Sequence, residues 1–300
     1  MVAPTAPARI VGIIGDPIAH SLSPRMHGAA FAASGVDWRY IPFRVTAADL
    51  EDAVRGIRAL GFAGFNVTVP HKQTIMPFLD GFEDQARDIG AVNAVRLEGR
   101  NLVGYNTDAP GLSDALTRDG GVRLAGARCL ILGAGGAGRS AAYALAGAGV
   151  RSLVILNRTP SRAEDVAARV AAAHPACAVS AGPLEPDSAR RATEDSDVII
   201  QATSATLSAA MGGGGGRAAW LRALEPAMRP GKTILDMVYT PRRTELLVAA
   251  GDAGATAVDG LSMLIYQGAR SFELWTGLSA PIDVMRRALD AAAQPGERVS

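Results

Sequence analysis

The glycine-rich segment 133–138 constrains the fold of this chain more than any other feature. Its sequence, Gly133-Ala134-Gly135-Gly136-Ala137-Gly138, has the spacing G-x-G-x-x-G. It follows the apolar segment 128–132, which is typical of a buried strand, and precedes the Ala-rich segment 141–148, which predicts a helix. Glycines in such a turn let a pyrophosphate approach the backbone at a helix amino-terminus. We therefore predict dinucleotide binding; the alternative is a glycine turn with only a structural role.

The end of the next predicted strand, 152–156, indicates which dinucleotide binds. Chains that bind NAD place an acidic residue about twenty positions after the glycine turn, where it accepts hydrogen bonds from the ribose. Here the segment is Asn157-Arg158-Thr159, with Arg162 close behind. A cation in this place can pair with the 2′-phosphate of NADP, and one charge-assisted hydrogen bond contributes about 1.5–3 kcal/mol. We predict NADP(H) as the cofactor; otherwise Arg158 is an ordinary surface residue.

Apolar segments alternate with helical ones along the chain, which indicates βαβ units. The fold class is therefore α/β with mainly parallel sheets, and 300 residues suffice for two modest domains. The glycine run Gly212–Gly216 is expected to be a low-complexity loop. Strands are predicted at 9–15, 38–45, 64–69, 128–132, 152–156, 198–201 and 233–237, and helices after Ser23-Pro24 and at 48–60, 141–148, 263–275 and 282–293.

Polar side chains gather in short segments of the first 108 residues, where strands are expected to end. The segments are 20–24 (HSLSP), 66–72 (NVTVPHK), 91–93 (AVN) and 104–108 (GYNTD). In open α/β sheets, ligands bind at the carboxyl ends of the strands. Many hydroxyls and amides with few aromatic rings suit a polyhydroxylated small molecule.

Each of these polar residues also has a structural interpretation. Ser23 could only cap a helix, and Asp108 could cap the helix that starts near Pro110. Asn93 could satisfy the backbone of a turn, as could Asn106, and Lys72 by itself could be a surface lysine. The histidines His20, His27 and His71 and the strand cysteine Cys129 are all interpreted as structural residues.

The composition excludes several classes of protein. Lys and Arg total 30 against 29 acidic residues, which leaves no electrostatic footprint for nucleic acid or an anionic membrane. Two cysteines exclude a disulfide framework, and no Cys/His spacing indicates a metal site. Residues 1–9 lack the apolar core that a signal peptide has, and we expect no span across a bilayer, because no apolar run is long enough. We expect a cytoplasmic protein whose partner is a small molecule; monomer and homodimer both remain open.

The polar segments and the glycine turn belong to a longer series of motifs. The series comprises GDP at 15–17, HSLSP at 20–24, NVTVPHK at 66–72, GAVN at 90–93, NTD at 106–108, the glycine turn, NRT at 157–159, TS at 203–204, DMVY at 236–239, and GLSML at 260–264 with Gln267. One such motif would be weak evidence, but these follow in order through most of the chain. Together they resemble the shikimate dehydrogenase family.

The resemblance implies a substrate-binding domain built from both chain ends, 1–108 completed by 260–300. A Rossmann-type NADP-binding domain, 109–259, would be inserted between them. The family also implies NADP(H)-dependent, reversible reduction of 3-dehydroshikimate to shikimate, a step towards aromatic amino acids.

The resemblance also implies roles for individual residues. Lys72 and Asp108 would form the catalytic pair, which suits a ketone that develops negative charge on oxygen as it accepts hydride. For the substrate, Ser21 and Ser23 would hold the carboxylate, Asn66, Thr68, Asn93 and Gln267 would contact ring hydroxyls, and Tyr239 would lie nearby. For the cofactor, the implied residues are Gly133, Ala134, Gly135, Gly136, Ala137, Gly138, Asn157, Arg158, Thr159, Thr203, Ser204, Val238, Gly260 and Met263.

Several positions depart from the family pattern. They are Gln201 for Asn, Thr206 for Gly, Ala94 for Thr and Gly28 for Asn, together with the added glycines at 212–216. These changes could relax substrate choice towards quinate or an amino analogue. The alternatives are therefore a quinate/shikimate or aminoshikimate dehydrogenase with relaxed cofactor use, and a non-catalytic binding homologue.

Overall fold

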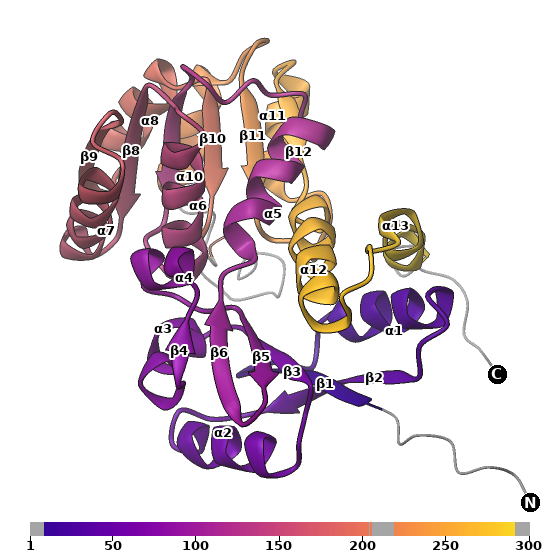
Figure 1. Cartoon of the computed structure of the whole chain (residues 1–300). Coiled ribbons are helices and arrows are strands. Elements are labelled where there is room, and N and C mark those ends of the chain that lie inside the picture. Colours follow the sequence, from indigo (N-terminus) through magenta and orange to yellow (C-terminus); the bar gives the residue numbers. More distant parts are fainter. Residues whose placement is uncertain (1–8, 204, 206–218, 292–300) are drawn as a thin grey trace, which may run out of the picture. The chain divides into compact units, whose positions relative to one another are not determined.

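The computed structural model describes residues 9–203, 205 and 219–291 (Figure 1). The chain divides into two compact units, Met1–Thr107 with Gly268–Ser300, and Asp108–Gln267. The second boundary falls inside helix α12 (Gly260–Thr276), whereas the sequence placed it before this helix. One helix therefore belongs in part to each unit.

The first unit contains a six-stranded sheet in the order β2-β1-β3-β5-β6-β4. Its elements are β1 (Arg9–Gly15), α1 (Ser23–Ala33), β2 (Trp38–Arg44), α2 (Leu50–Ala59), β3 (Gly64–Val67), α3 (His71–Thr74), η1 (Met76–Phe78), β4 (Gly81–Phe82), α4 (Asp84–Ile89), β5 (Ala94–Glu98), β6 (Asn101–Tyr105) and, later in the chain, the end of α12 and α13 (Ile282–Asp290). β1 pairs in parallel with β2 and β3, whereas β5 is antiparallel to both β3 and β6. The sheet is thus mixed: the pairs around β1 and the β4–β6 pair are parallel, whereas β5 is antiparallel to its neighbours.

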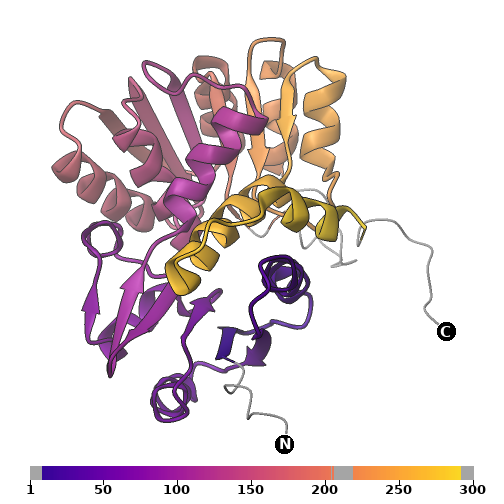
Figure 2. The same ribbon diagram turned by 45° about the vertical axis from the view of Figure 1, so that its right-hand side comes forward.

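Helices cover this sheet on both faces. Figures 1 and 2 show α1 and α2 on opposite faces. In α2 the apolar residues recur at helical spacing, so that Leu50, Val54 and Ile57 are buried on one stripe. That stripe belongs to a core cluster with Ile14 of β1 and Phe65 of β3. The packing fixes the ends of β1 and β3, where the polar motifs begin.

The second unit contains a fully parallel sheet in the order β12-β11-β10-β7-β8-β9. Its elements are α5 (Asp108–Asp114), η2 (Ala115–Asp119), β7 (Arg128–Leu132), α6 (Gly136–Gly147), β8 (Ser152–Asn157), α7 (Pro160–Ala173), β9 (Ala178–Pro183), α8 (Pro186–Asp195), β10 (Val198–Gln201), α10 (Ala219–Leu224), η3 (Glu225–Ala227), β11 (Thr233–Asp236), α11 (Glu245–Asp252), β12 (Thr256–Val258) and the start of α12. The strand order reverses between β7 and β10, which is where dinucleotides bind in doubly wound sheets.

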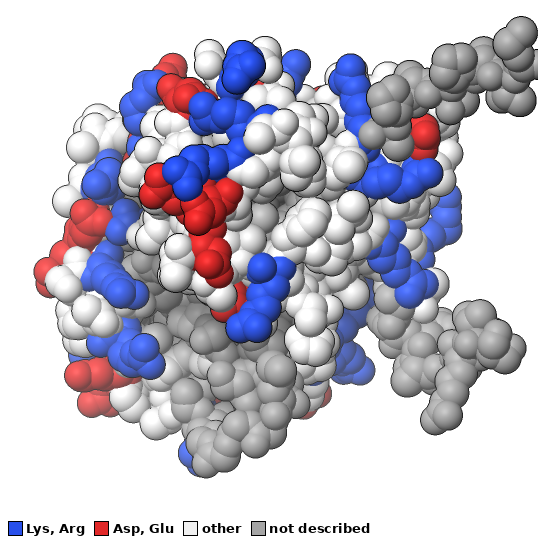
Figure 3. Space-filling view, turned by 90° about the horizontal axis from the view of Figure 1, so that it is seen from below, with Lys and Arg blue, Asp and Glu red and all other residues white. Residues whose placement is uncertain are grey.

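Every predicted strand is present and ends within two residues of its predicted bounds. The hairpin of β5 and β6 was not predicted, and neither were β4, β9 and β12. No helix in the described part of the chain is long and apolar enough to cross a membrane. On the face drawn in Figure 3, basic side chains are interspersed with acidic ones, as the near-zero net charge leads one to expect.

Candidate active site

Two polar motifs meet at the carboxyl ends of β1 and β3. The N–H of Asp16 donates to the carbonyl of Val69 at 2.9 Å, and the N–H of Thr68 donates to that of Ile14 at 3.0 Å. A Cβ at Gly15 would lie 2.4 Å from the Thr68 methyl carbon, so only glycine allows this approach. The loop with Ser21 and the loop with Thr68 therefore start from one point.

The two serines lie where α1 begins. The cap position of α1 is Leu22, which makes no side-chain cap bond, and Ser23 is the first helical residue. The Oγ of Ser21 accepts a hydrogen bond from the N–H of Ser23 at 3.3 Å. The interpretation of Ser23 as a helix cap is therefore wrong, because the turn places it one residue too late.

Asn66 and Asn93 lie side by side in a buried polar network. The Asn66 Nδ2 donates to the Asn93 carbonyl at 2.9 Å and to the Ser271 Oγ at 3.0 Å. Both ends of the Asn93 amide bond Thr107: its Oδ1 accepts from the Thr107 N–H at 2.7 Å, and its Nδ2 donates to the Thr107 Oγ1 at 2.9 Å. Asn93 thus satisfies backbone, as one alternative expected, and it also positions the residue before Asp108.

The two predicted catalytic residues occupy short, well-anchored segments. Lys72 is half-buried in α3, and its carbonyl accepts from the N–H of Val92 at 2.7 Å. Asp108 directly follows Thr107 and begins α5. In the second unit, a Cβ at Gly111 of α5 would lie 2.6 Å from the backbone N of Gln267, so α5 and α12 touch through backbone. This contact holds Gln267 close to the helix that Asp108 begins.

His27, His71 and Cys129 are buried, as their structural interpretation leads one to expect. His71 is buried, and its Nε2 lies 2.7 Å from the Val45 carbonyl. Burial lowers the pKa of His27 to about 3 and raises the pKa of Cys129 to about 12. At neutral pH His27 is therefore a neutral ring and Cys129 a thiol, so neither provides a charged or nucleophilic group.

The glycine turn has the shape that its sequence predicts. Gly133 has a φ of 111°, which favours glycine, and a Cβ at Gly138 would lie 2.1 Å from the Gly133 carbonyl oxygen. By contrast, a Cβ at Gly135 would meet nothing within 4 Å. The protein's own packing therefore requires Gly133 and Gly138, whereas the space beside Gly135, at the start of the twelve-residue helix α6, is open to a ligand.

Residues 157–162, which are expected to meet the 2′-phosphate, follow the end of β8. The Asn157 Oδ1 accepts from the N–H of Ala134 at 3.1 Å, and its Nδ2 donates to the Thr159 carbonyl at 2.9 Å, so the strand end is tied to the glycine turn. Arg158 and Arg162 are exposed, and no ion pair joins either to another residue of the described chain. Two cations beside a helix amino-terminus fit the phosphates of NADP. The segment also lacks the acidic residue that NAD-binding sites use.

The remaining residues that are expected to bind the cofactor follow β10 and β11. Gln201 holds the turn after β10: its Oε1 accepts from the Thr203 N–H at 2.5 Å and its Nε2 donates to the Thr203 carbonyl at 3.0 Å. Asp236 accepts from the N–H of Val238, next to Tyr239, at 3.0 Å. Gly260 packs on the same segment, since a Cβ there would lie 2.7 Å from the Met237 carbonyl oxygen, and Met263 is buried one turn later. Ser204, Thr206 and Gly212–Gly216 lie outside the described residues.

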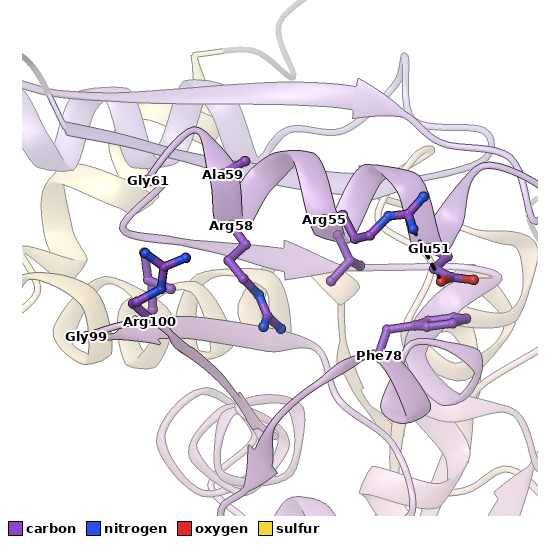
Figure 4. A pocket seen from close by; sticks show the side chains of 10 residues that line it. Glu51, Arg55, Arg58, Ala59, Gly61, Phe78, Gly99 and Arg100 are labelled. Atoms are coloured by element: carbon purple, nitrogen blue, oxygen red, sulfur yellow. Dashed lines mark ion pairs between the residues drawn. The ribbon is translucent and has the colours of Figure 1, made fainter.

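A pocket of about 580 Å³ lies elsewhere in the first unit and contains none of these residues (Figure 4). Arg55, Arg58 and Arg100 line it together with Glu51. Two of the arginines are neutralised nearby, because Arg58 pairs with Asp80 at 2.8 Å and Arg55 pairs with Glu51 and Asp52. We therefore do not treat this pocket as the candidate active site.

Comparison with known proteins identifies the family. Residues 13–95 match the shikimate dehydrogenase substrate binding domain, 115–211 match shikimate/quinate 5-dehydrogenase, and 260–289 match the shikimate 5′-dehydrogenase C-terminal domain. A relative from Geobacter sulfurreducens, named shikimate dehydrogenase (NADP(+)), is 43% identical over 288 residues, which are 96% of this chain and 98% of the relative. The chain belongs to the shikimate dehydrogenase family.

Solved structures of the family have the same fold. The shikimate dehydrogenase of Thermus thermophilus, in complex with NADP(H) and shikimate, is 33% identical with a TM-score of 0.80, covering 95% of this chain and 99% of that one. The quinate dehydrogenase of Corynebacterium glutamicum, in complex with NAD, is 30% identical with a TM-score of 0.82, also covering 95% and 99%. The family thus includes members that differ in substrate and cofactor.

Proposed function

We propose that this chain is an NADP-dependent shikimate dehydrogenase that reversibly reduces 3-dehydroshikimate to shikimate. The observation that carries the cofactor choice is the exposed pair Arg158 and Arg162 beside the glycine turn, without an acidic residue at the strand end. The full-length relative named for NADP(+) supports it. A reaction that uses NADPH, in a chain with the buried thiols Cys129 and Cys177, belongs in the cytoplasm.

The first unit supplies most of the substrate-binding groups. Ser21 and Ser23 bind the carboxylate through their hydroxyls, at the start of α1. Asn66, Thr68 and Asn93 bind ring hydroxyls at the end of β3 and the start of β5. From the second unit, Gln267 contributes its amide and Tyr239 its ring. These groups are hydroxyls and amides, which suits a ring with several hydroxyls and one carboxylate.

Lys72 and Asp108 carry out the proton chemistry. Bound NADPH supplies the hydride. As the ketone becomes an alkoxide, the Lys72 ammonium stabilises the developing charge and donates a proton to that oxygen; the reverse reaction returns the proton to Lys72. The Asp108 carboxylate keeps the ammonium oriented. General acid–base catalysis of this kind typically contributes about 10²–10⁴-fold in rate.

Quinate oxidation with NAD is the second candidate. The observation that favours it is the 30% identity with the quinate dehydrogenase of Corynebacterium glutamicum, together with Gly28 and Ala94, which depart from the family pattern near the substrate motifs. It is the weaker candidate because Arg158 stands where an acid would favour NAD.

Initial rates with purified protein test the proposal. Shikimate and quinate are each paired with NADP⁺ and with NAD⁺, and the four values of kcat/KM are compared. We expect the highest value for shikimate with NADP⁺. A higher value for quinate with NAD⁺ would favour the second candidate, and no turnover in any pairing would contradict both.

A further inference from the structure

Backbone groups fix the orientation of the Asn66 amide. The carbonyl oxygen of Asn93 can only accept a hydrogen bond, so the side-chain atom of Asn66 that lies 2.9 Å from it must be Nδ2. The other end of the amide is then Oδ1, which lies 2.7 Å from the Tyr40 Oη. Tyr40 must therefore donate its phenol proton to Asn66.

The internal partners use both N–H groups of Asn66. One points to the Asn93 carbonyl and the other to the Ser271 Oγ, at 3.0 Å. The Oδ1 accepts from Tyr40 and retains a second lone pair. Within the described chain, that lone pair is the part of the amide that remains for a ligand. Asn66 is thus prepared to accept a hydrogen bond and not to donate one.

The network extends from Ser271 through Thr107 to Asn93, and further hydrogen bonds connect these residues to one another. Ser271 Oγ lies 3.1 Å from Thr107 Oγ1, which accepts from the Asn93 Nδ2 at 2.9 Å. The Thr107 N–H can only donate, so the atom of Asn93 that it contacts at 2.7 Å must be Oδ1. Both amides therefore have a fixed orientation, because rotation of either would place like atoms against each other.

Aromatic packing holds Tyr40 itself. The His27 ring stacks on the Tyr40 ring with centroids 4.4 Å apart and planes inclined by 6°, and Trp275 lies at 6.1 Å. Trp275 is anchored in turn, since its Nε1 donates to the Val95 carbonyl at 3.0 Å. His27 is neutral, because burial lowers its pKa to about 3. The packing therefore fixes the position of the Tyr40 hydroxyl, which donates its hydrogen bond to the Asn66 Oδ1.

We propose that Tyr40 and Ser271 are positioning residues that keep Asn66 a hydrogen-bond acceptor towards the substrate, so that the site selects a ring substituent that donates. This inference rests on the proposed function, which places Asn66 against a ring hydroxyl. A hydroxyl or an amino group at that ring position can donate to Oδ1. An O-methyl group cannot, and it would leave two acceptors facing each other in a buried site.

A cycle of ligand and protein changes tests the proposal. Calorimetry measures the binding of shikimate, and of analogues with each ring hydroxyl replaced in turn by hydrogen, to the wild type, Tyr40→Phe and Ser271→Ala. We expect each variant to bind shikimate about two- to tenfold more weakly, the range for one neutral hydrogen bond. At one ring position the deoxy analogue should lose less affinity in the variants than in the wild type, because Asn66 no longer recognises that hydroxyl. The effect on shikimate turnover should appear in KM, with kcat and the KM for NADP⁺ unchanged.

Tyr105→Phe is the matched control, since it removes a phenol in the same unit that donates to the Glu98 carboxylate at 2.7 Å, outside the network. It should bind every ligand as the wild type does. If Tyr40→Phe and Ser271→Ala weaken shikimate and all deoxy analogues by one common factor, or weaken none, the positioning role is wrong.

The wild type gives an independent test should either variant fail to fold. At the ring position that contacts Asn66, the amino analogue should bind more tightly than the O-methyl analogue; the reverse order would overturn the proposal. Failure of the proposed function would look different. In that case the wild type would not oxidise shikimate with either cofactor, whereas the binding cycle does not depend on turnover.

Discussion

His27 shows at the scale of one residue how burial sets a charge state. The ring is fully buried against Tyr40, Phe31 and Trp275, and neither ring nitrogen has a hydrogen bond within the described chain. Burial without a partner lowers its pKa from 6.5 to about 3. The folded protein therefore excludes a proton that the unfolded chain accepts.

This exclusion predicts a loss of stability in mild acid. Between pH 6.5 and about 3 the unfolded state binds the proton and the folded state does not, so stability falls as the pH is lowered. The slope from this residue is about 1.4 kcal/mol per pH unit. Urea unfolding at pH 7, 6, 5 and 4 should show a shallower loss for His27→Leu than for the wild type. Equal slopes for the two proteins would contradict the assignment.

The two lysines Lys72 and Lys232 should respond differently to substitution. Lys72→Ala should lower kcat by about 10²–10⁴-fold while the protein stays folded, because it removes the proposed proton donor. Lys232 is buried, and its Nζ donates to the carbonyls of Thr193, at 2.7 Å, and Glu194, at 3.0 Å. Lys232→Ala should therefore lower Tm with little effect on kcat. Near-normal kcat in folded Lys72→Ala would exclude the catalytic role.

The sequence could indicate Asn66 as a polar residue at a strand end, but not the partners that orient it. Tyr40 lies 26 residues away and Ser271 lies 205 residues away. Neither belongs to a motif, and each has an ordinary position in its own element. Their role arises from tertiary contacts, which no local pattern encodes. Gln201 is similar: it was noted as a departure from the family pattern, whereas the structure shows that it holds the Thr203 turn.

At the scale of elements, the turn between β7 and α6 separates packing from ligand binding. Gly138→Ala should lower Tm, because its Cβ would collide with the Gly133 carbonyl oxygen at 2.1 Å. Gly135→Ala should leave Tm unchanged, since no atom lies within 4 Å of the added Cβ. It should nevertheless weaken the binding of NADP⁺, because the methyl group would occupy the space in front of the helix amino-terminus. Thermal unfolding and a fluorescence titration with NADP⁺ distinguish the two. Unchanged NADP⁺ affinity in Gly135→Ala would place the pyrophosphate elsewhere.

The end of β8 should determine cofactor preference. Arg158→Gln should reduce kcat/KM for NADP⁺ roughly ten- to a hundredfold, the contribution of a charge-assisted contact, and leave the value for NAD⁺ unchanged. Arg169→Gln is the control, because this arginine of α7 pairs with Asp165 at 3.4 Å. Equal losses for both cofactors would mean that Arg158 acts on the fold and not on the 2′-phosphate.

Seven of the twelve strands in the described chain were predicted, because a continuous apolar run is typical of a buried strand; β4, β9 and β12 were missed along with the β5–β6 hairpin. Helix bounds were less accurate: α6 begins at Gly136, within the glycine turn itself, and not at Ala141. The β5–β6 hairpin escaped prediction because Arg96, Glu98 and Asn101 interrupt its apolar pattern on the exposed face.

At the scale of the whole molecule, the first unit is discontinuous in sequence. Helical spacing predicted a helix near 263–275, but only the family resemblance assigned the chain's end to the first unit. The structural reason is a set of long-range bonds, from Trp275 to Val95 and from Ser271 to Asn66. Such contacts are invisible to periodicity, because periodicity reports on neighbours in the chain.

The two units should respond to different ligands. Trp220 lies in the second unit, and Trp38 and Trp275 lie in the first, so variants that retain one set report on one unit. NADP⁺ at a hundred times its Kd should stabilise the unit that binds it by about 2.7 kcal/mol. In urea unfolding, NADP⁺ should raise the midpoint reported by Trp220 more than the midpoint reported by Trp38 and Trp275. Shikimate should raise the midpoint reported by Trp38 and Trp275 more than the one reported by Trp220. Identical shifts for both reporters would show that the units unfold together.

The discontinuity also sets the order in which a ribosome can complete the molecule. Synthesis proceeds from the amino-terminus, and domains generally fold as units as they emerge. The partners of Asn66 and Val95 are Ser271 and Trp275, which are translated only after every strand of the second unit. Until then, the nascent first unit lacks the hydrogen bonds that Ser271 and Trp275 make to Asn66 and Val95. The substrate-binding half of the enzyme, which begins first, is finished last.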